Sequence, residues 1–392
     1  MADEVTYFPV GNADMTLLKL RDGTVVLIDC YLQEAATDTS PTVAKDLIDQ
    51  LPKDAKKRPY VDIFILTHPD EDHCKGAKQY MHLGSPSDYD DQSADKKIFI
   101  RQMWSSPLIF RRQSKSHKLC DDAQALNTEA KRRVQKYRDS TATSISGMAE
   151  GEQIRLIGSD WKRDDGSNRL ADLDGIRTQV KGKISWSDDA GSPLVEVYVH
   201  GPLDPSEGES FASNEETLSK NGSSIILRWK VFAKAPNSFQ YNALLFGGDA
   251  EVDIWDRLWR ENIKDPEPLE YDVLLAPHHC SWGVLSSGDA TDSSSEVNPN
   301  ARKALSQKRQ GAKIFSSSKP IKNDKDNPPA DRAKREYKSI VSGDANFKCL
   351  GEYPKEAKPE PLKLTLSKDG TKIESKALAG SAAIITTPTR AG

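Results

Sequence analysis

The sequence predicts an α/β fold, and three observations support this prediction. Short apolar stretches rich in β-branched and aromatic residues, such as Val61–Leu66, have the composition of buried strands. They alternate along the chain with segments of helical spacing, such as Asp121–Arg138. Several apolar stretches also run directly into Asp or His residues, as α/β sheets do where they place ligands at strand ends.

The N-terminal part of the chain leads through strands and one helix to a dense cluster of polar side chains. Asp22-Gly23 is the tip of a predicted hairpin. The predicted elements are strands at Thr6–Val10, Met15–Leu20, Thr24–Asp29 and Val61–Leu66, and helices at Thr42–Leu51 and Cys74–Leu83. The cluster Thr67-His68-Pro69-Asp70-Glu71-Asp72-His73 therefore lies where a strand ends and a helix begins.

Residues 85–161 are interpreted as a helical, basic insertion. A strand begins near Lys96, and Asp121 opens a helix that runs to Arg138. From Lys96 to Arg138, twelve Lys and Arg residues stand against three acids, in a chain whose net charge is −4. This excess fits either a solvated helix face or a surface that binds nucleic acid. The predicted substrate contacts on the helix are Lys131, Arg132 and Arg133.

The second half of the chain repeats the alternation, and two of its strands end in possible ligands. Strands are predicted at Leu194–His200, Ser223–Val231, Asn242–Phe246, Asp272–Ala276 and Ala312–Ser316, helices near 253–262, 300–309 and 330–342, and a hairpin at Leu362–Ile373. Asp249 follows one strand after two glycines, and His278-His279 follow another after a proline. We expect one domain over 1–380 and a flexible tail over 381–392.

Composition narrows the class of protein. The hydrophobic fraction is 36% and the charged fraction 29%, which predicts many solvated loops. No apolar run approaches the ~20 residues that span a bilayer, and the acidic N-terminus does not fit a signal peptide, so no membrane association is expected. Five widely spaced cysteines predict reduced thiols in a cytoplasmic protein.

Three strand ends carry nitrogen and oxygen donors, and together they predict a metal site. The donors are His68, Asp70, Asp72 and His73, then Asp249, then His278 and His279. Imidazole and carboxylate ligands suit zinc, manganese or iron better than a thiolate centre would. A carboxylate reached through two glycines can bridge two cations that share a hydroxide poised to attack an ester. An acidic turn with hydrogen-bonded histidines is the alternative interpretation.

At these residues the sequence resembles the metallo-β-lactamase-fold hydrolases, and most of all the C-terminal hydrolase domain of the DNA-uptake protein ComEC in a soluble, stand-alone form. The similar stretches are VGNADMTLLKLRDGTVVLID at 10–29, THPDEDHCKG at 67–76, NGSSIILRW at 221–229, LLFGGDAE at 244–251 and LLAPHHCSWG at 274–283. The resemblance implies an αβ/βα sandwich of two mixed β-sheets flanked by helices, with a dinuclear metal site at one edge.

The resemblance also implies roles for individual residues. His68 and Asp70 would hold the first of two divalent ions, Zn²⁺ or Mn²⁺, and Asp72 and His73 the second, with Asp249 between them. Asp72 would also orient the attacking hydroxide. We favour His278 as the last ligand and His279 as the catalytic residue that contacts substrate, although the order of this pair stays open. Asn221 and Ser281 are the expected substrate contacts, and Asp29 a structural residue beside the site.

Cys74, Asn221 and Cys280 depart from the pattern of the family, and Cys74 is expected to be buried in its helix. Asn221 stands where the wider superfamily has a His, so the first metal is either weakly held or uses His200 in its place. A structural role at the end of its own strand is the commoner meaning of His200. Cys280 stands where relatives have Gly, and it is either a soft ligand, a site of oxidation or a small apolar filler.

Three functions fit these features. The first is a phosphodiesterase or nuclease that uses a metal-bridging hydroxide and binds nucleic acid through residues 96–138, with a role in anti-phage defence suggested by family analogy alone. The second is a hydrolase of a small ester, cyclic nucleotide, lactone or thioester. The third is a non-catalytic, metal-stabilised partner protein. Protein partners cannot be named from the sequence.

Overall fold

The computed structural model describes residues 2–33, 43–110, 118–158, 170–203, 221–233 and 240–374. The predicted tail at 381–392 lies outside these residues, as do Arg111, Arg112 and Lys115 of the basic segment.

A nine-stranded mixed sheet contains most strands of the N-terminal half. Its strand order is β19-β18-β1-β2-β3-β5-β6-β7-β8, and the strands from β3 to β8 in this order run parallel. The strands are β1 (Asp3–Tyr7), β2 (Thr16–Lys19), β3 (Val25–Ile28), β5 (Tyr60–Ile65), β6 (Phe99–Ser105), β7 (Gln153–Ile157), β8 (Arg177–Thr178), β18 (Leu362–Ser367) and β19 (Gly370–Ile373).

A seven-stranded mixed sheet contains the strands from β9 to β15. Its order is β15-β14-β13-β12-β11-β10-β9, with β12 to β15 parallel. The strands are β9 (Lys183–Ser187), β10 (Pro193–Gly201), β11 (Ile226–Phe232), β12 (Tyr241–Phe246), β13 (Tyr271–Leu275), β14 (Lys308–Ser316) and β15 (Phe347–Cys349). Short strands β4 (Cys30–Tyr31), β16 (Pro354–Lys355) and β17 (Lys358–Pro359) lie outside both sheets.

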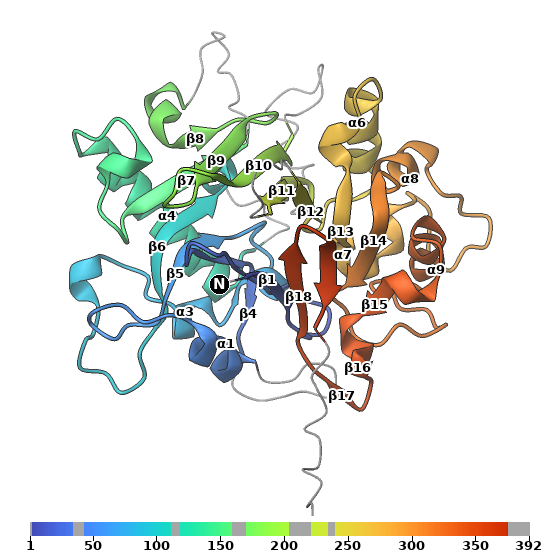
Figure 1. The fold of residues 1–392 in the computed structure, drawn as a ribbon, viewed down its shortest axis with the longest axis horizontal. Coiled ribbons are helices and arrows are strands. Elements are labelled where there is room, and N and C mark those ends of the chain that lie inside the picture. Colours follow the sequence, from blue (N-terminus) through green and yellow to red (C-terminus); the bar gives the residue numbers. More distant parts are fainter. Residues whose placement is uncertain are drawn as a thin grey trace, which may run out of the picture.

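The two sheets pack face to face, and helices cover their outer faces (Figure 1). One core cluster joins the inner faces, where Trp104 of β6 stacks on Trp229 of β11. The first sheet is covered by α1 (Ala44–Gln50), α2 (Glu71–Cys74), α3 (Ala77–Tyr80) and α4 (Asp121–Arg138). The second is covered by α6 (Val252–Asn262), α8 (Pro299–Leu305) and α9 (Asp331–Ile340). This arrangement confirms the predicted sandwich of two mixed sheets flanked by helices.

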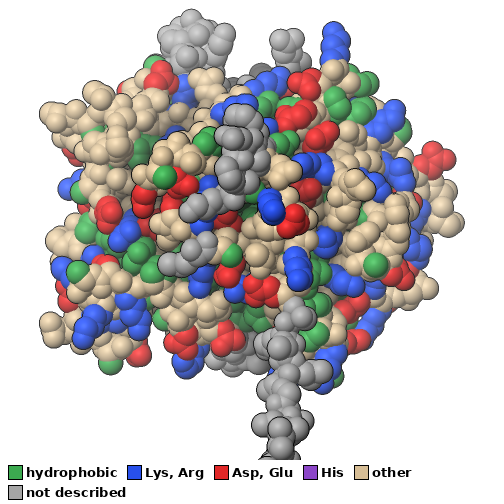
Figure 2. Space-filling view, in the orientation of Figure 1, with side chains coloured by type: hydrophobic (Ala, Val, Ile, Leu, Met, Phe, Trp, Pro, Cys, Tyr) green, Lys and Arg blue, Asp and Glu red, His purple; other side chains and the backbone are tan. Residues whose placement is uncertain are grey.

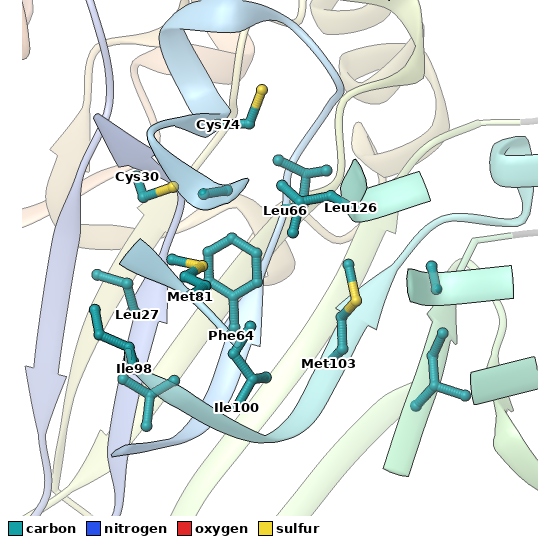
Figure 3. Close-up of a cluster of buried hydrophobic side chains, with 14 of the residues drawn as sticks. Leu27, Cys30, Phe64, Leu66, Cys74, Met81, Ile98, Ile100, Met103 and Leu126 are labelled. Carbon is teal, nitrogen blue, oxygen red and sulfur yellow. The ribbon is translucent and has the colours of Figure 1, made fainter. Parts of the chain in front are cut away.

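Strand periodicity decides which core each side chain enters. In β5, Ile63 and Ile65 belong to the core between the sheets, whereas Phe64 belongs to the core beneath the helices. Figure 3 shows Phe64 in that second core, together with Met103 of β6 and Leu126 of α4. Alternate residues of one strand thus hold the sheet to both neighbouring layers.

Two sequence predictions about the first sheet and the helices that cover it were wrong. Residues 85–161 are not an appended insertion, because β6 pairs with β5 and β7 pairs with β6 inside the first sheet. The helix predicted over Cys74–Leu83 is broken into α2 and α3 by extended Lys75 and by Gly76. Gly76 has φ +80, and a Cβ there would lie 2.0 Å from the carbonyl oxygen of Leu32.

Among the described residues, every helix is too short or too polar to cross a bilayer. All five cysteines are free thiols. The single-domain organisation and the cytoplasmic location stay predictions.

Candidate metal centre

The ends of three parallel strands meet at one edge of the sandwich. β5 leads into Thr67-His68, β12 into Gly247-Gly248-Asp249, and β13 into the turn α7 (Pro277–Cys280). Main-chain hydrogen bonds join these ends, since Ile225 N–H donates to Thr67 O at 2.9 Å and His278 N–H donates to Gly248 O at 3.0 Å. His68 and His279, which are 211 positions apart in the sequence, are therefore brought to one place.

Unusual backbone conformations aim these side chains. Gly248 has φ +51, and a Cβ there would come within 3.0 Å of the Ser224 Cβ, so glycine is required beside Asp249. His278, His279 and Cys280 have φ values of 48, 51 and 67. Each left-handed non-glycine residue costs roughly 1–2 kcal/mol, and such strain is concentrated at functional sites.

One group of donors surrounds Oδ1 of Asp249. His73 Nε2 lies 3.1 Å from this oxygen and His279 Nε2 lies 3.6 Å from it. Asp72 Oδ2 is 3.2 Å from His279 Nε2. Asp14 joins the group, because ligand atoms of Asp14, His73, Asp249 and His279 all lie within 4.8 Å of one another. We call His73, Asp72, His279 and Asp249 Oδ1, with Asp14, group B.

A second group surrounds Oδ2 of the same carboxylate. His68 Nε2 and His278 Nε2 each lie 3.7 Å from Asp249 Oδ2. Asp70 Oδ2 lies 3.8 Å from His68 Nε2. We call His68, Asp70, His278 and Asp249 Oδ2 group A. The two oxygens of Asp249 thus face two different sets of donors.

In their neutral form, the histidines of group B point a lone pair of Nε2, rather than a hydrogen, at the carboxylates. Asp29 Oδ2 accepts from His73 Nδ1–H at 2.7 Å, and Ser317 O accepts from His279 Nδ1–H at 3.0 Å. In a neutral ring the other nitrogen then has no hydrogen. Nε2 of His68 and of His73, and Oδ1 of Asp14 and of Asp249, are buried atoms without a hydrogen-bond partner in the described part of the chain. Opposed lone pairs at these distances call for a proton or a cation between them.

Asp29 holds the framework of group B. Its carboxylate accepts hydrogen bonds from Thr67 N–H at 2.7 Å and Thr67 Oγ1–H at 2.6 Å, as well as from His73. It is 1% exposed, and its own φ is 55. A carboxylate behind a ligating histidine sets the tautomer of that histidine. The structure therefore places Asp29 beside the donors and not among them, as predicted.

Burial and neighbouring charges both shift the pKa values of the donors, and for Asp72 and His279 the two effects act in opposite directions. Burial lowers the pKa of His68 to about 3. Burial by itself would raise the pKa of Asp72, but the hydrogen bond with His279 and the charge of His73 lower it to about 2. Burial would lower the pKa of His279, but Asp249, Asp14 and Asp72 raise it to about 10. In the absence of cations, protons on the imidazoles compensate the buried carboxylates.

Asn221 and His278 are linked through Glu251. Asn221 Nδ2–H donates to Glu251 Oε1 at 3.0 Å, and the same oxygen lies 3.4 Å from His278 Nδ1. The side chain of His278 is 18% exposed, whereas that of His279 is 1% exposed. Both histidines therefore lie beside Asp249: His279 is buried among the donors of group B, and His278 is the more exposed of the two.

Three other predicted positions lie away from the donors. His200 is 2% exposed, and its Nε2–H donates to Pro268 O at 2.8 Å, so it does not replace the missing histidine. Cys280 is fully buried in the core beneath the helices of the second sheet, which fits the apolar filler. Ser281 is also buried and bonds to Asn327, so the prediction that it contacts substrate is not supported.

In the described part of the chain, the arginines of the predicted nucleic-acid surface are paired with acidic side chains. Arg133 is 1% exposed and its Nε lies 2.7 Å from Glu129, so the prediction that it binds substrate was wrong. Arg132 lies against Glu129 and Glu152, and Lys131 is exposed. Basic and acidic side chains are also interspersed over the face drawn in Figure 2.

Asp14 is the donor that sequence reasoning missed. It lies 3.6 Å from His279 Nδ1, and its backbone N–H donates to Asp72 O at 3.1 Å. The available signal was its place in VGNADM, within the first stretch that resembles the family. The turn around Asp14 follows no predicted parallel strand, so Asp14 was not among the donors expected at strand ends.

No family model and no curated protein matches the chain. It is similar to a mutant of the CmlA β-hydroxylase, with a TM-score of 0.41 and 12% identity over 93% of this chain and 54% of that one. It is also similar to Igni18, a metallo hydrolase from Ignicoccus hospitalis, with a TM-score of 0.35 and 13% identity over 93% of this chain and 98% of that one. The Rm3 metallo-β-lactamase gives a TM-score of 0.28 and 12% identity over 71% of this chain and 79% of that one.

The chain spans about half the length of the CmlA structure. These likenesses are too low to carry a functional argument. The assignment of a metal centre therefore rests on the donor atoms themselves.

Proposed function

We propose that the protein is a metal-dependent hydrolase that binds two divalent cations, one in group A and one in group B. The observation that carries this proposal is the division of Asp249, whose two oxygens each face a separate set of nitrogen and oxygen donors. One carboxylate that serves two sets is the arrangement expected of a bridging ligand.

The donors fit such ions in type and in spacing. Ligands ~2.1 Å from a tetrahedral ion lie roughly 3.4 Å apart. The distances from His73, His279, His68 and His278 to the oxygens of Asp249 run from 3.1 to 3.7 Å. Nitrogen and carboxylate donors suit Zn²⁺ or Mn²⁺. His278 supplies to group A the imidazole that Asn221 does not.

The residues around the ions have separate tasks. When bound, two divalent cations polarise the scissile group and lower the pKa of water. Asp29 keeps Nε2 of His73 free of hydrogen, and Ser317 does the same for His279. Asp72 Oδ2, on the exposed side of group B, is placed to accept a hydrogen bond from the attacking water. Glu251, which accepts a hydrogen bond from Asn221, lies beside the ring of His278.

A phosphodiester is the proposed bond, and a small phosphodiester is favoured over a long polynucleotide. The resemblance to the DNA-uptake hydrolases supports phosphodiester chemistry. Among the described residues, the internal pairing of Arg132 and Arg133 removes two of the three contacts predicted on α4 for a polynucleotide backbone. A small ester or thioester is the alternative substrate, because the same donors serve either bond.

The test measures metal content and hydrolysis in one preparation. We expect about two equivalents of metal per chain, and cleavage of bis-p-nitrophenyl phosphate with Zn²⁺ or Mn²⁺ that the double variant Asp72→Ala/His73→Ala loses. His82→Ala is the matched control, because His82 bonds Ser85 O at 2.8 Å in a separate aromatic cluster. Single-stranded DNA, double-stranded DNA and RNA are tested in parallel.

Each outcome discriminates between the functions. Stoichiometric metal without cleavage of any phosphodiester refutes the phosphodiesterase, and a panel of carboxylic esters and thioesters then tests the alternative. Metal with no turnover on the whole panel is the result expected of a non-catalytic partner protein. A chain that binds no divalent cation refutes the proposal altogether.

A further inference from the structure

Two thiols meet directly behind the metal centre. Cys74 follows His73 in the chain and ends α2, and Cys120 is the N-cap of α4. Their sulfur atoms are 3.7 Å apart. Cys74 is fully buried, whereas Cys120 is partly exposed. One thiol of the pair is thus open to a solvent oxidant and the other is in contact with it.

The two helices that carry these thiols are fixed to each other. Asp122, in the first turn of α4, accepts hydrogen bonds from the N–H groups of Gly76 at 3.0 Å and Lys78 at 2.8 Å. Both N–H groups belong to residues just after Cys74, so these hydrogen bonds fix the chain at Cys74 against the start of α4, where Cys120 lies. Cys30 lies opposite Cys74 in an isolated bridge, but in Figure 3 the sulfur of Cys74 is directed away from it.

The surroundings of Cys120 favour its thiolate. Ala123 N–H donates to its sulfur at 3.4 Å, as expected at the start of an 18-residue helix. The hydrogen bond with Cys74 and this backbone donor lower the pKa of Cys120 to about 6. Cys74 Sγ–H donates to the carbonyl oxygen of Asp70 at 3.0 Å, and either thiol can be the donor across the contact between the two sulfurs.

We propose that Cys74 and Cys120 form a reversible disulfide under oxidation by a peroxide, and that this disulfide weakens cation binding at groups A and B. The effect on cations rests on the proposed function; the thiol chemistry does not. The Cys120 thiolate attacks hydrogen peroxide, which gives a sulfenic acid and hydroxide. The Cys74 sulfur then attacks Cys120 Sγ and displaces the sulfenic oxygen. In total, two thiols and one peroxide give one disulfide and two waters.

The bond changes the support of the metal centre in two ways. A disulfide needs its sulfurs about 2.0 Å apart, so they must approach by roughly 1.7 Å from their present separation. Cys74 moves with its neighbour His73, whose imidazole faces Asp249. The Asp70 carbonyl also loses its thiol donor. Because both groups draw donors from this segment, we expect at least a tenfold loss of cation affinity, within the range for changes to residues that support ligands.

The experiment uses the full chain, reduced and then treated with hydrogen peroxide. We expect two of the five thiols to be lost, a peptide map that contains a Cys74–Cys120 link, and recovery of both thiols with dithiothreitol. Cation affinity, titrated with Zn²⁺ and with Mn²⁺, is expected to fall in oxidised wild type. Cys120→Ser cannot form the disulfide, so it is expected to keep its cation affinity after peroxide treatment. This result would assign the loss of affinity in wild type to the disulfide. Cys349→Ser, which removes a buried thiol from a different core cluster, behaves as wild type.

A map with no link, or with a link to Cys30, overturns the proposal. So does a link that leaves the affinity unchanged. If the reduced protein binds neither cation, the proposed function is refuted. The peptide map alone then tests whether the Cys74–Cys120 disulfide forms.

Discussion

Replacing Asp29 by Asn tests whether the tautomer of His73 controls the metal centre. The substitution keeps shape and backbone, because Asn tolerates the left-handed conformation that Asp29 adopts at φ 55. It exchanges one acceptor for an NH₂ donor. Oδ1 and Oδ2 face three hydrogens, those of Thr67 N–H, Thr67 Oγ1–H and His73 Nδ1–H, at 2.6 to 2.7 Å. An amide has one acceptor oxygen, so it can accept hydrogen bonds at only one of the two positions that the carboxylate oxygens occupy.

The preferred orientation of the amide disables His73. If the amide oxygen stays on Thr67 N–H, the new NH₂ faces His73 Nδ1, which must then accept. The hydrogen of His73 moves to Nε2, the atom 3.1 Å from Asp249 Oδ1. A cation in group B must displace that hydrogen. We expect a 10–100-fold loss of affinity there, equal to about 1.4–2.7 kcal/mol, with a smaller change at group A.

The assay is a two-site competition titration of Zn²⁺ against a chromophoric chelator, with circular dichroism as a check of folding. Asp272→Asn is the matched control, because Asp272 likewise accepts from a backbone N–H at 2.7 Å and from Arg309 at 2.7 Å, at the opposite end of β13. The control is expected to lose stability and to keep both affinities. Unchanged binding in Asp29→Asn, or an equal loss in the control, refutes the tautomer argument.

Three further outcomes are expected. Asp249→Asn loses both cations together in metal analysis, because each of its oxygens serves one group; retention of one full equivalent contradicts a bridging role. Burial lowers the pKa of His200 from 6.5 to about 4, so the unfolded chain binds the extra proton between these values and the free energy of unfolding falls by about 3 kcal/mol as pH drops through that window. His200→Gln keeps a donor for Pro268 O and flattens this slope in urea titrations, and an unchanged slope disproves the assignment. Lys131→Glu/Lys136→Glu leaves phosphodiester cleavage and the salt dependence of any nucleic-acid binding unchanged, whereas a salt slope reduced by about 2 indicates a polyanion surface on α4.

Local sequence was sufficient for every donor except Asp14, and for much of the framework. The apolar runs before His68, Asp249 and His278 end within one residue of the ends of β5, β12 and β13, since strand periodicity and composition are set by neighbouring residues. The role of Asp29 beside the site also followed from the chain's resemblance to the family. Helix α4 was expected over Asp121–Arg138 and occupies those residues.

Contacts between distant segments decided the rest. The break between α2 and α3 exists because Leu32 O occupies the space beside Gly76, which no local pattern reveals. Residues 96–138 looked like a basic insertion, but β6 is an inner strand and Arg133 is neutralised by Glu129 within the core. A charge count along the sequence does not record which charges are buried against each other.

The assignment of the two histidines after β13 also required the tertiary structure. A His-His pair has two possible orders, and only the left-handed backbone at 278–280 turns His279 into group B and His278 towards group A and Glu251. The sequence by itself determined which residue types reach this edge of the sandwich, because strand ends are local features. The tertiary structure decided which oxygen of Asp249 each imidazole faces, because that depends on backbone direction and on partners such as Ser317 and Asp14.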